Sequence, residues 1–276
     1  MQKTVLISGC SSGFGLSTTR RLLDAGWKVI ATARNPKNCD ELNKINSDSL
    51  VILPLDVTQD TDLKHIQYYL SHELEGQLDC LINNAGYGLL GPFEELSIEQ
   101  IHHQFAVNVF GLMQLTQICL PFLRKTQGRI INVSSVLGYV GLPLHSLYVS
   151  SKYALEGFTE SLYYELASFN VQVALIEPGA HSTRFGSNAV SPTPANDNGV
   201  YTKQKNSFVR YKQKLTHGKN GSSEKFADCI VRLLKKNSMP LRTRLGLDAQ
   251  LVYLLKYLLP ASWCNRIFKY VFKRMF

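Results

Sequence analysis

Short apolar runs alternate with amphipathic stretches along the first 180 residues of the chain. The apolar runs are rich in β-branched residues, as in strands that are buried on both faces of a parallel sheet. Strands are predicted in this way at residues 4–8, 28–33, 50–53, 78–83, 129–134 and 172–176. Helices are predicted at about 16–25, 60–73, 98–125 and 147–166. This alternation predicts an α/β fold, a doubly wound parallel sheet of the Rossmann type with helices on both faces.

A glycine-rich turn joins the first predicted strand to the first predicted helix. Glycine lets the backbone approach phosphate groups that a Cβ would keep away, and a helix N-terminus attracts their negative charge. Strand, glycine-rich turn, helix and strand together form the unit that holds a dinucleotide pyrophosphate. We therefore expect a cofactor to bind at this turn, against Gly9, Ser11, Ser12, Gly13, Phe14 and Gly15.

The residue after the second strand predicts which dinucleotide binds. An acidic side chain there would bond the ribose 2′-hydroxyl of NAD, but this chain has Ala33 followed by Arg34. A guanidinium suits a 2′-phosphate, which favours NADP(H) over NAD(H), although Arg34 also fits an ordinary surface arginine. Asp56, beside Val57 at the end of the third strand, could accept a hydrogen bond from the adenine amine. The turn with Asn83, Ala85 and Gly86 is expected at the carboxyl ends of the strands, where open α/β sheets bind ligands.

Tyr148 and Lys152 form a candidate catalytic pair. On a helix, their spacing of four residues places the phenol and the ammonium on one face. A nearby cation would lower the tyrosine pKa from about 10 toward working pH, which makes Tyr148 a candidate general acid/base. Ser135 could hydrogen-bond the oxygen on which Tyr148 acts. By itself the spacing also fits an exposed tyrosine beside a solvated lysine.

These segments together resemble the classical short-chain dehydrogenase/reductase family over residues 3 to about 185. The family's Thr-Gly-x3-Gly-x-Gly fingerprint appears from Ser8 to Gly15 with Ser in place of Thr, and Asn-Asn-Ala-Gly and Tyr-x3-Lys are intact. The resemblance selects Ser135 rather than Ser134 as the catalytic serine. It adds Asn108, in the middle of a predicted helix, where the residue alone would suggest an exposed or backbone-bonded amide. It also implies cofactor contacts from Pro178, Gly179, Thr183, Tyr148 and Lys152.

The resemblance implies a reaction on CH–OH groups, of the EC 1.1.1 type. Tyr148 would exchange a proton with the substrate oxygen during hydride transfer, and Ser135 would polarise that oxygen. Lys152 would bond the nicotinamide ribose and lower the pKa of Tyr148, and Asn108 would hold a water in the proton relay. The segments Gly141–Pro143 and Ala154–Phe158 are most similar to the 17-beta-hydroxysteroid and retinol dehydrogenase branch. That likeness implies a lipophilic ketone, aldehyde or alcohol of steroid, retinoid or fatty type.

Three alternatives stay open on the sequence. The first is a reductase of small polar carbonyls, and the second is a non-catalytic NADP(H)-binding sensor or scaffold. The third is an epimerase or dehydratase of the extended branch, whose chains are usually longer and have a different glycine spacing. The resemblance also implies a homodimer or homotetramer, paired through the fourth and fifth helices.

The positive charge is concentrated in the C-terminal quarter. Residues 1–200 carry 13 Lys/Arg and 18 Asp/Glu, whereas residues 201–276 carry 17 Lys/Arg and 3 Asp/Glu. After Pro260, the apolar Trp263, Ile267, Tyr270, Val271 and Met275 share one helix face, and Arg266, Lys269, Lys273 and Arg274 lie largely on the other. Such a tail could pack on the core, contact a partner subunit or bind an anionic membrane surface. Nucleic acid is not expected, because no recognition motif accompanies the charge.

Length and cysteine content bound the remaining expectations. A chain of 276 residues is expected to form one domain, with a variable substrate lid at 185–219 and a basic amphipathic tail at 250–276. The six cysteines are scattered without ligand spacing, which predicts reduced thiols and no metal site. No signal-peptide pattern and no run of eighteen apolar residues is found, so we expect a cytoplasmic protein, peripheral on a membrane if the tail binds one.

Overall fold

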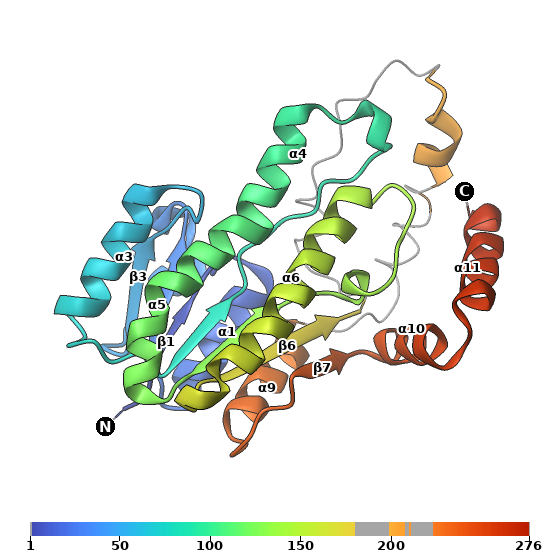
Figure 1. Cartoon of the computed structure of the whole chain (residues 1–276). Coiled ribbons are helices and arrows are strands. Elements are labelled where there is room, and N and C mark those ends of the chain that lie inside the picture. The colour runs from blue at the N-terminus through green and yellow to red at the C-terminus, as the bar shows by residue number, and fades with distance from the viewer. Residues whose placement is uncertain (1, 180–198, 208–209, 211–222, 276) are drawn as a thin grey trace.

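The chain folds around a seven-stranded parallel sheet with strand order β3-β2-β1-β4-β5-β6-β7 (Figure 1). The structure is a computed structural model and describes residues 2–179, 199–207, 210 and 223–275. Its strands are β1 (Thr4–Ile7), β2 (Lys28–Ala33), β3 (Leu50–Pro54), β4 (Cys80–Asn83), β5 (Arg129–Val133), β6 (Gln172–Pro178) and β7 (Arg242–Leu245). The strand order reverses between β1 and β4, and their carboxyl ends therefore flank the switch point at which doubly wound sheets bind ligands.

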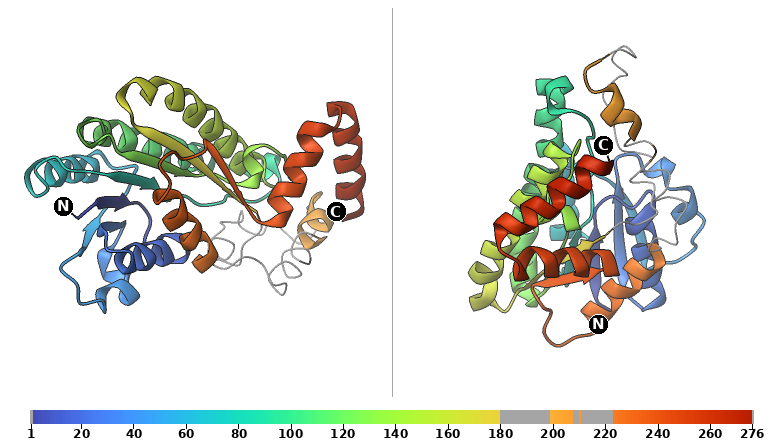
Figure 2. Two further views of the ribbon diagram at one scale, coloured as in Figure 1. Left: turned by 90° about the horizontal axis from the view of Figure 1, so that it is seen from below. Right: turned by 90° about the vertical axis from the view of Figure 1, so that its right-hand side faces the viewer.

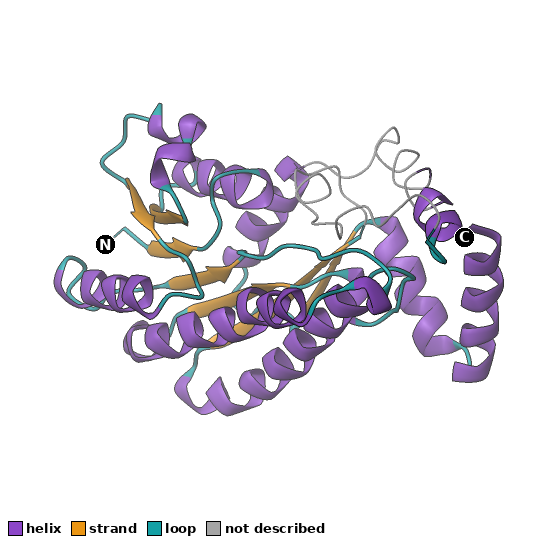
Figure 3. Ribbon diagram, turned by 90° about the horizontal axis from the view of Figure 1, so that it is seen from above, coloured by secondary structure: helices purple, strands orange, loops and turns teal. Residues whose placement is uncertain are grey.

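Helices cover both faces of this sheet (Figures 2 and 3). The α-helices of the described residues are α1 (Gly13–Asp24), α2 (Asp40–Asn43), α3 (Asp60–His72), α4 (Ile98–Phe105), α5 (Leu112–Thr126), α6 (Ser146–Leu166), α9 (Ser223–Leu234), α10 (Leu247–Leu258) and α11 (Ala261–Met275), of which α10 and α11 lie beyond the sheet. Successive strand residues point to opposite faces: Val5 and Ile7 pack in the core cluster of α1 and α9, and Leu6 packs in that of α3, α5 and α6. The predicted doubly wound α/β fold is confirmed.

The helix predicted at 98–125 is confirmed as one helical stretch, Ile98–Thr126, but a π-helical segment, Ala106–Gly111, lies inside it between α4 and α5. β7 was not predicted, since its sequence Arg-Thr-Arg-Leu is short and three of its four residues are polar. It pairs with β6 at the edge of the sheet, where polar side chains can stay partly exposed and find partners.

The C-terminal tail forms two helices that project from the body of the molecule, as Figures 1 and 2 show. Between residues 247 and 273, only Ala249 and Cys264 are buried. The helix predicted after Pro260 is confirmed as α11. Most of the predicted lid lies outside the described residues, which include only 199–207 and 210 of it.

One helical stretch, Ile98–Thr126, is long and apolar enough to cross a bilayer by composition alone. In this fold it covers the sheet, and its Leu115, Cys119 and Leu123 are fully buried in the core beneath it. We therefore interpret it as a core helix.

Candidate active site

The glycine-rich turn packs directly on the loop that follows β4. Gly9 has a φ of 75°, and a Cβ on it would lie 2.9 Å from Ala85 Cα. A Cβ on Gly15 would lie 2.2 Å from the carbonyl oxygen of Gly9. Both positions require glycine, and the resulting tight turn places the N-terminus of α1 at the carboxyl edge of the sheet.

Side chains of Ser8 and Asn84 join this turn to the β4 loop. Ser8 Oγ accepts hydrogen bonds from the N–H groups of Asn84 and Ala85, both at 3.0 Å. Asn84 Nδ2 donates to the carbonyl oxygens of Ser8 at 2.9 Å and Gly9 at 3.0 Å. The hydroxyl that serine shares with threonine makes these contacts, so the departure from the family fingerprint leaves the turn intact. Asn84 was not predicted as a site residue, and the Asn-Asn pair was the available signal.

Two other predicted cofactor residues, Phe14 and Asp56, use their side chains in contacts within the protein. The Phe14 ring stacks on Phe226 of α9, with centroids 4.0 Å apart, which fixes α1 against α9. The Asp56 carboxylate accepts from the N–H of Thr58 at 2.9 Å and from its Oγ1 at 2.7 Å. Because the Phe14 ring is packed on Phe226, we expect any contact of Phe14 with a cofactor to come from its main chain. Ser11 and Arg34 are exposed, Ser12 and Gly13 begin α1, and Val57 is buried against Gly111.

Asn83 is buried beneath the site. Its Nδ2 donates to Thr116 Oγ1 at 2.9 Å and to Asn132 Oδ1 at 2.8 Å, which joins β4 to β5 and α5. At the other end of the site, the Gly179 N–H donates to the carbonyl oxygen of Leu245 at 2.9 Å, directly after Pro178 ends β6. Thr183 lies outside the described residues.

Asn108 lies in the π-helical segment and is almost fully buried. Its Oδ1 accepts from the N–H of Tyr87 at 3.0 Å, and its Nδ2 donates to the Tyr87 carbonyl oxygen at 2.9 Å and to Ser151 Oγ at 3.2 Å. Ser151 Oγ in turn donates to the carbonyl oxygen of Tyr148. The amide is therefore backbone-bonded, and it also connects this segment to α6. The exposed-amide alternative is wrong.

Ser135, Tyr148 and Lys152 come together at the carboxyl end of β5. The side chains of Ser135 and Tyr148 are hydrogen-bonded, and Ser135 Oγ also accepts from the N–H of Leu137 at 3.2 Å. Lys152 Nζ lies 5.7 Å from the centroid of the Tyr148 ring and donates to the Val133 carbonyl oxygen at 2.7 Å. All three residues are at most 8% exposed, so the alternative of a solvated tyrosine–lysine pair is wrong.

Burial moves the two pKa values of this pair in opposite directions. Desolvation raises the pKa of Tyr148, although the hydrogen bond from Ser135 opposes the shift. Desolvation lowers the pKa of Lys152 to about 8, and the charge of Glu156 opposes that shift. The spacing predicted a lowered Tyr148 pKa, but the structure has the opposite direction, because the cost of burying a phenolate outweighs the stabilisation by its neighbours. Tyr148 is a protonated phenol here.

Comparison with known proteins agrees with this geometry. The family model for short chain dehydrogenases matches residues 3–193. Retinol dehydrogenase 8 of Bos taurus is 34% identical, over 88% of this chain and 81% of its own length. The 3-ketodihydrosphingosine reductase of Bacteroides thetaiotaomicron is 32% identical, over 90% of either chain.

Solved structures share the whole architecture. A short-chain dehydrogenase from Streptomyces avermitilis is 32% identical with a TM-score of 0.80, over 98% of this chain and 96% of its own. A serine dehydrogenase complexed with NADP+ is 26% identical with a TM-score of 0.75, over 88% of this chain and 94% of its own. From its fold, the extent of the match and these relatives, the chain belongs to the short-chain dehydrogenase/reductase family of oxidoreductases, with relatives of the retinol dehydrogenase type.

Proposed function

We propose that the protein is an NADP(H)-dependent oxidoreductase that interconverts a lipophilic ketone or aldehyde and its alcohol. The observation that carries the proposal is the buried group of Ser135, Tyr148 and Lys152 at the carboxyl end of β5. It combines a proton donor, a hydroxyl that can polarise a carbonyl oxygen, and a cation, which are the groups that carbonyl reduction needs.

Each side chain has a distinct task in this reaction. The protonated phenol of Tyr148 gives its proton to the substrate oxygen in reduction and accepts it in oxidation. Ser135 holds that oxygen beside the phenol, and Lys152 stabilises the phenolate left after proton transfer. Asn108 holds the π-helical segment and α6 in register through Ser151. A nicotinamide cofactor, when bound, supplies or accepts the hydride.

The turn and Arg34 support NADP(H) as that cofactor. The turn presents the N-terminus of α1 at the switch point of the sheet, and its two constrained glycines leave room for a phosphate group to approach the backbone. Arg34 is exposed directly after β2, where its guanidinium could pair with a 2′-phosphate. The NADP+ in the related serine dehydrogenase is consistent with this choice.

An apolar pocket beside α6 supports a lipophilic substrate. The pocket has a volume of about 340 Å³, and mostly carbon atoms line it, from Gly91, Pro92, Phe93, Leu142, Pro143, Leu144, Ser146, Tyr201 and Gln204. Ser146 lies two residues before Tyr148 at the start of α6. Tyr201 Oη donates to Glu94 Oε2 at 2.8 Å and Lys205 pairs with Glu95, which holds residues 199–207 over this side. Two relatives whose names specify retinol and 3-ketodihydrosphingosine fit the same substrate class.

We further propose that α10 and α11 bind an anionic membrane surface, from which such a substrate would be taken. Large apolar side chains are at least 40% exposed along both helices, namely Leu247, Leu251, Leu254, Tyr257, Leu258, Trp263, Ile267, Tyr270 and Val271. A soluble monomer rarely exposes so many together. Lys256, Arg266, Lys269 and Lys273 are exposed on the same helices, whereas Asp248 is their single acidic residue. This charge suits anionic lipid and would repel a second copy of the same tail.

A homodimer or homotetramer is the proposed assembly. Phe110 of the π-helical segment and Tyr153 and Tyr164 of α6 are 42% to 65% exposed. They lie on helices that pack together on one face of the sheet, as Figure 1 shows for α4, α5 and α6. Exposed aromatic residues are typical of the buried centre of protein interfaces.

The test is oxidation of NADPH with a panel of steroid ketones, retinal, long-chain aldehydes and small polar ketones, repeated with NADH. The proposal expects turnover with lipophilic members and a preference for NADPH. Turnover with the small polar ketones alone would replace the substrate class but keep the reaction. Tight cofactor binding without turnover on any member would favour a sensor or scaffold and reject the proposed reaction.

A further inference from the structure

Glu156 is a carboxylate on the buried face of α6 that has no place in the reaction described above. It follows Lys152 by four residues and Tyr148 by eight, so the three side chains lie along one face of the helix. It is only 8% exposed. A buried carboxylate is costly unless charges and hydrogen bonds compensate for the lost water, so its partners indicate why it is there.

One carboxylate oxygen joins α6 to the segment that carries Ser135. Ser134 Oγ donates to Glu156 Oε1 at 2.5 Å, a short charge-assisted hydrogen bond. The next turn of the chain closes over this contact, since a Cβ on Gly138 would lie 2.8 Å from Ser134 Oγ and 2.9 Å from Glu156 Cγ. Glu156 therefore fixes the position of the residue next to Ser135 relative to the helix that carries Tyr148.

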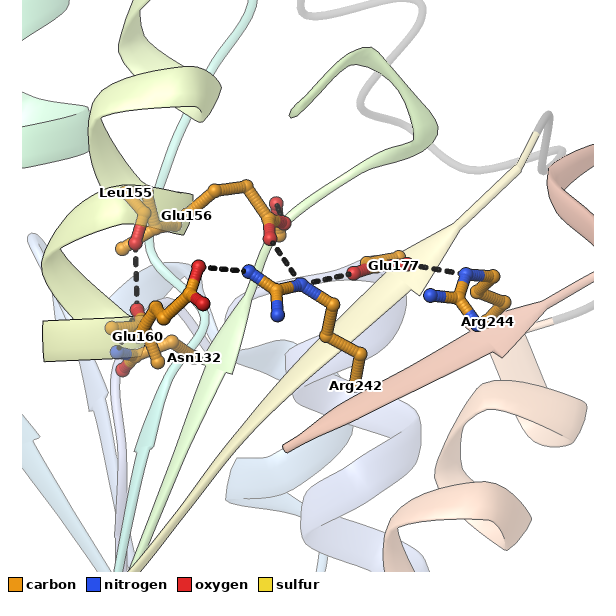
Figure 4. Close-up of polar contacts among 9 residues, drawn as sticks. Asn132, Leu155, Glu156, Glu160, Glu177, Arg242 and Arg244 are labelled. Carbon is orange, nitrogen blue, oxygen red and sulfur yellow. Dashed lines mark hydrogen bonds and ion pairs between the residues drawn. The ribbon is translucent and has the colours of Figure 1, made fainter. Parts of the chain in front are cut away.

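The other oxygen faces an arginine from β7. Arg242 Nε lies 3.2 Å from Glu156 Oε2, and the same guanidinium contacts Glu160 at 2.8 Å and Glu177 at 3.4 Å (Figure 4). Arg244 contacts the second oxygen of Glu177 at 3.2 Å, at ion-pair distance without hydrogen-bond geometry. Arg242 thus fixes Glu156 from the one strand of the sheet that was not predicted.

Charge balance links this cluster to Lys152. The titratable and charged groups around Lys152 and Glu156 are Tyr148 and Glu160 on α6, Glu177 on β6, Arg242 and Arg244 on β7, Tyr139 after β5, and Tyr257 on α10. Burial lowers the pKa of Lys152 because it disfavours the charged ammonium, whereas the negative charge of Glu156 raises this pKa. Without Glu156, the burial of Lys152 would be less compensated, which would lower the pKa of its ammonium further.

We propose that Glu156 is a positioning residue for the proposed reaction: it holds Lys152 as an ammonium and fixes the Ser135 segment against α6, with Arg242 holding Glu156 in place. This inference rests on the proposed function for its kinetic consequence.

The experiment compares Glu156→Gln with Glu160→Gln as the matched control. Glutamine keeps the acceptor for Ser134 Oγ but removes the charge. Because a neutral Lys152 no longer stabilises the phenolate, activity is lost as pH rises through the Lys152 pKa. We expect Glu156→Gln to move this alkaline loss to lower pH and to reduce kcat about tenfold at neutral pH, with KM for NADPH changed less than about twofold. Glu160, which contacts Arg242 on the exposed side, should leave the profile in place when it is replaced.

A second readout separates this inference from the proposed function. The Lys152 amine can be titrated by NMR of enzyme with 13C-labelled lysine, with Lys152→Arg to assign its signal. The midpoint should fall in Glu156→Gln and stay in Glu160→Gln, whether or not a substrate has been found. An unchanged midpoint would overturn the proposal, and turnover failure with a shifted midpoint would reject only the proposed reaction.

Two further variants keep the test decisive if Glu156→Gln does not fold. Glu156→Asp keeps the charge, so the Lys152 midpoint should stay close to that of the native enzyme while kcat falls, because the shorter side chain no longer reaches Ser134 and Arg242 together. Ser134→Ala removes only the contact to Oε1, so kcat should fall with no shift of the alkaline loss. Native kcat in both variants would overturn the positioning role.

Discussion

Burial changes the pKa values of Tyr148 and Lys152 in opposite directions, and both changes suit the proton transfer that we propose. The buried phenol stays protonated and can act as an acid, whereas the buried ammonium has a pKa of about 8, close to working pH. Lys152 also donates to the Val133 carbonyl oxygen, which fixes its ammonium beside the Ser135 segment. A small change in the charge around Lys152 therefore changes the fraction of enzyme that is competent.

Replacement of the phenol tests its role as proton donor. Tyr148→Phe keeps the ring but removes the hydroxyl, so we expect kcat to fall by about 10² to 10⁴. NADPH affinity should change little, since the ring still fills the same space. Steady-state kinetics and fluorescence titration with NADPH measure the two effects separately. Turnover at the native rate would contradict the mechanism.

Charge reversal at the end of β2 tests cofactor choice. Arg34→Asp should shift the ratio of kcat/KM for NADPH over NADH toward NADH by about tenfold or more, because a carboxylate repels a 2′-phosphate and accepts from a 2′-hydroxyl. Lys37→Asp, an equal charge change at a nearby exposed position, is the control and should shift the ratio much less. Equal shifts in the two variants would show a general charge effect and reject the specific contact.

At the scale of elements, the π-helical segment Ala106–Gly111 positions Asn108. The segment passes so close to the turn after β3 that a Cβ on Gly111 would lie 2.6 Å from Val57 Cγ2 and 2.7 Å from the Val57 carbonyl oxygen. An insertion of this kind in a helix rotates the residues that follow, and such segments are frequent at functional sites. In this protein, the π-helical segment contains Asn108, whose side-chain amide is hydrogen-bonded to Tyr87 and Ser151.

Gly111→Ala should therefore disturb this segment. We expect the free energy of unfolding to fall by about 1 to 3 kcal/mol, because the added methyl overlaps backbone as well as a side chain. Gly157→Ala in α6 is the matched control: nothing lies within 4 Å of its Cβ position. In the control, stability should rise by about 0.5 to 1 kcal/mol through helix propensity. Urea unfolding measures both, and equal stabilities of the two variants would refute the close packing.

In the molecule as a whole, β7 connects the elements around the candidate active site to the C-terminal tail. Arg242 and Arg244 reach from β7 to carboxylates on α6 and β6, and the Arg244 guanidinium carbon lies 3.2 Å from the centroid of the Tyr253 ring on α10. Tyr139 Oη, four residues after Ser135, donates to the Ala249 carbonyl oxygen at 2.8 Å. The exposed apolar helices α10 and α11 are thus attached to the body next to the candidate active site.

Charge substitution on the exposed face of α11 tests membrane binding. The double variant Trp263→Glu with Ile267→Glu should lose sedimentation with phosphatidylserine-containing vesicles, because it removes apolar contact and adds repulsion. Tyr68→Glu, an exposed aromatic residue on α3, is the control and should sediment like the native protein. Binding should also weaken with salt and be poor on neutral phosphatidylcholine vesicles. Unchanged sedimentation of the double variant would reject this surface.

Local sequence patterns, which span only a few residues, predict most of the sheet and the glycine-rich turn. Alternation of apolar runs with amphipathic stretches placed six of the seven strands, and the glycines placed the turn, because both depend on local geometry. The spacing from Ser135 to Tyr148 and Lys152 identified the candidate catalytic group through the family resemblance. β7 was missed because its polar residues are stabilised by partners on α6 and β6, about 65 to 86 positions away in the chain.

Tertiary structure alone decided how those residues behave. Residue identity does not reveal burial, and burial reversed the expected direction of the Tyr148 pKa and lowered that of Lys152. In the sequence, Asn108 and Glu156 are ordinary polar residues in a helical pattern. In the folded protein, segments far away in the chain bury both of them. Local conformation encodes the fold class and the glycine-rich turn, which the sequence was therefore enough to predict, and the family resemblance added the candidate reactive groups. Their charge states and positioning depend on desolvation and on neighbours far along the chain, which only the folded molecule brings together.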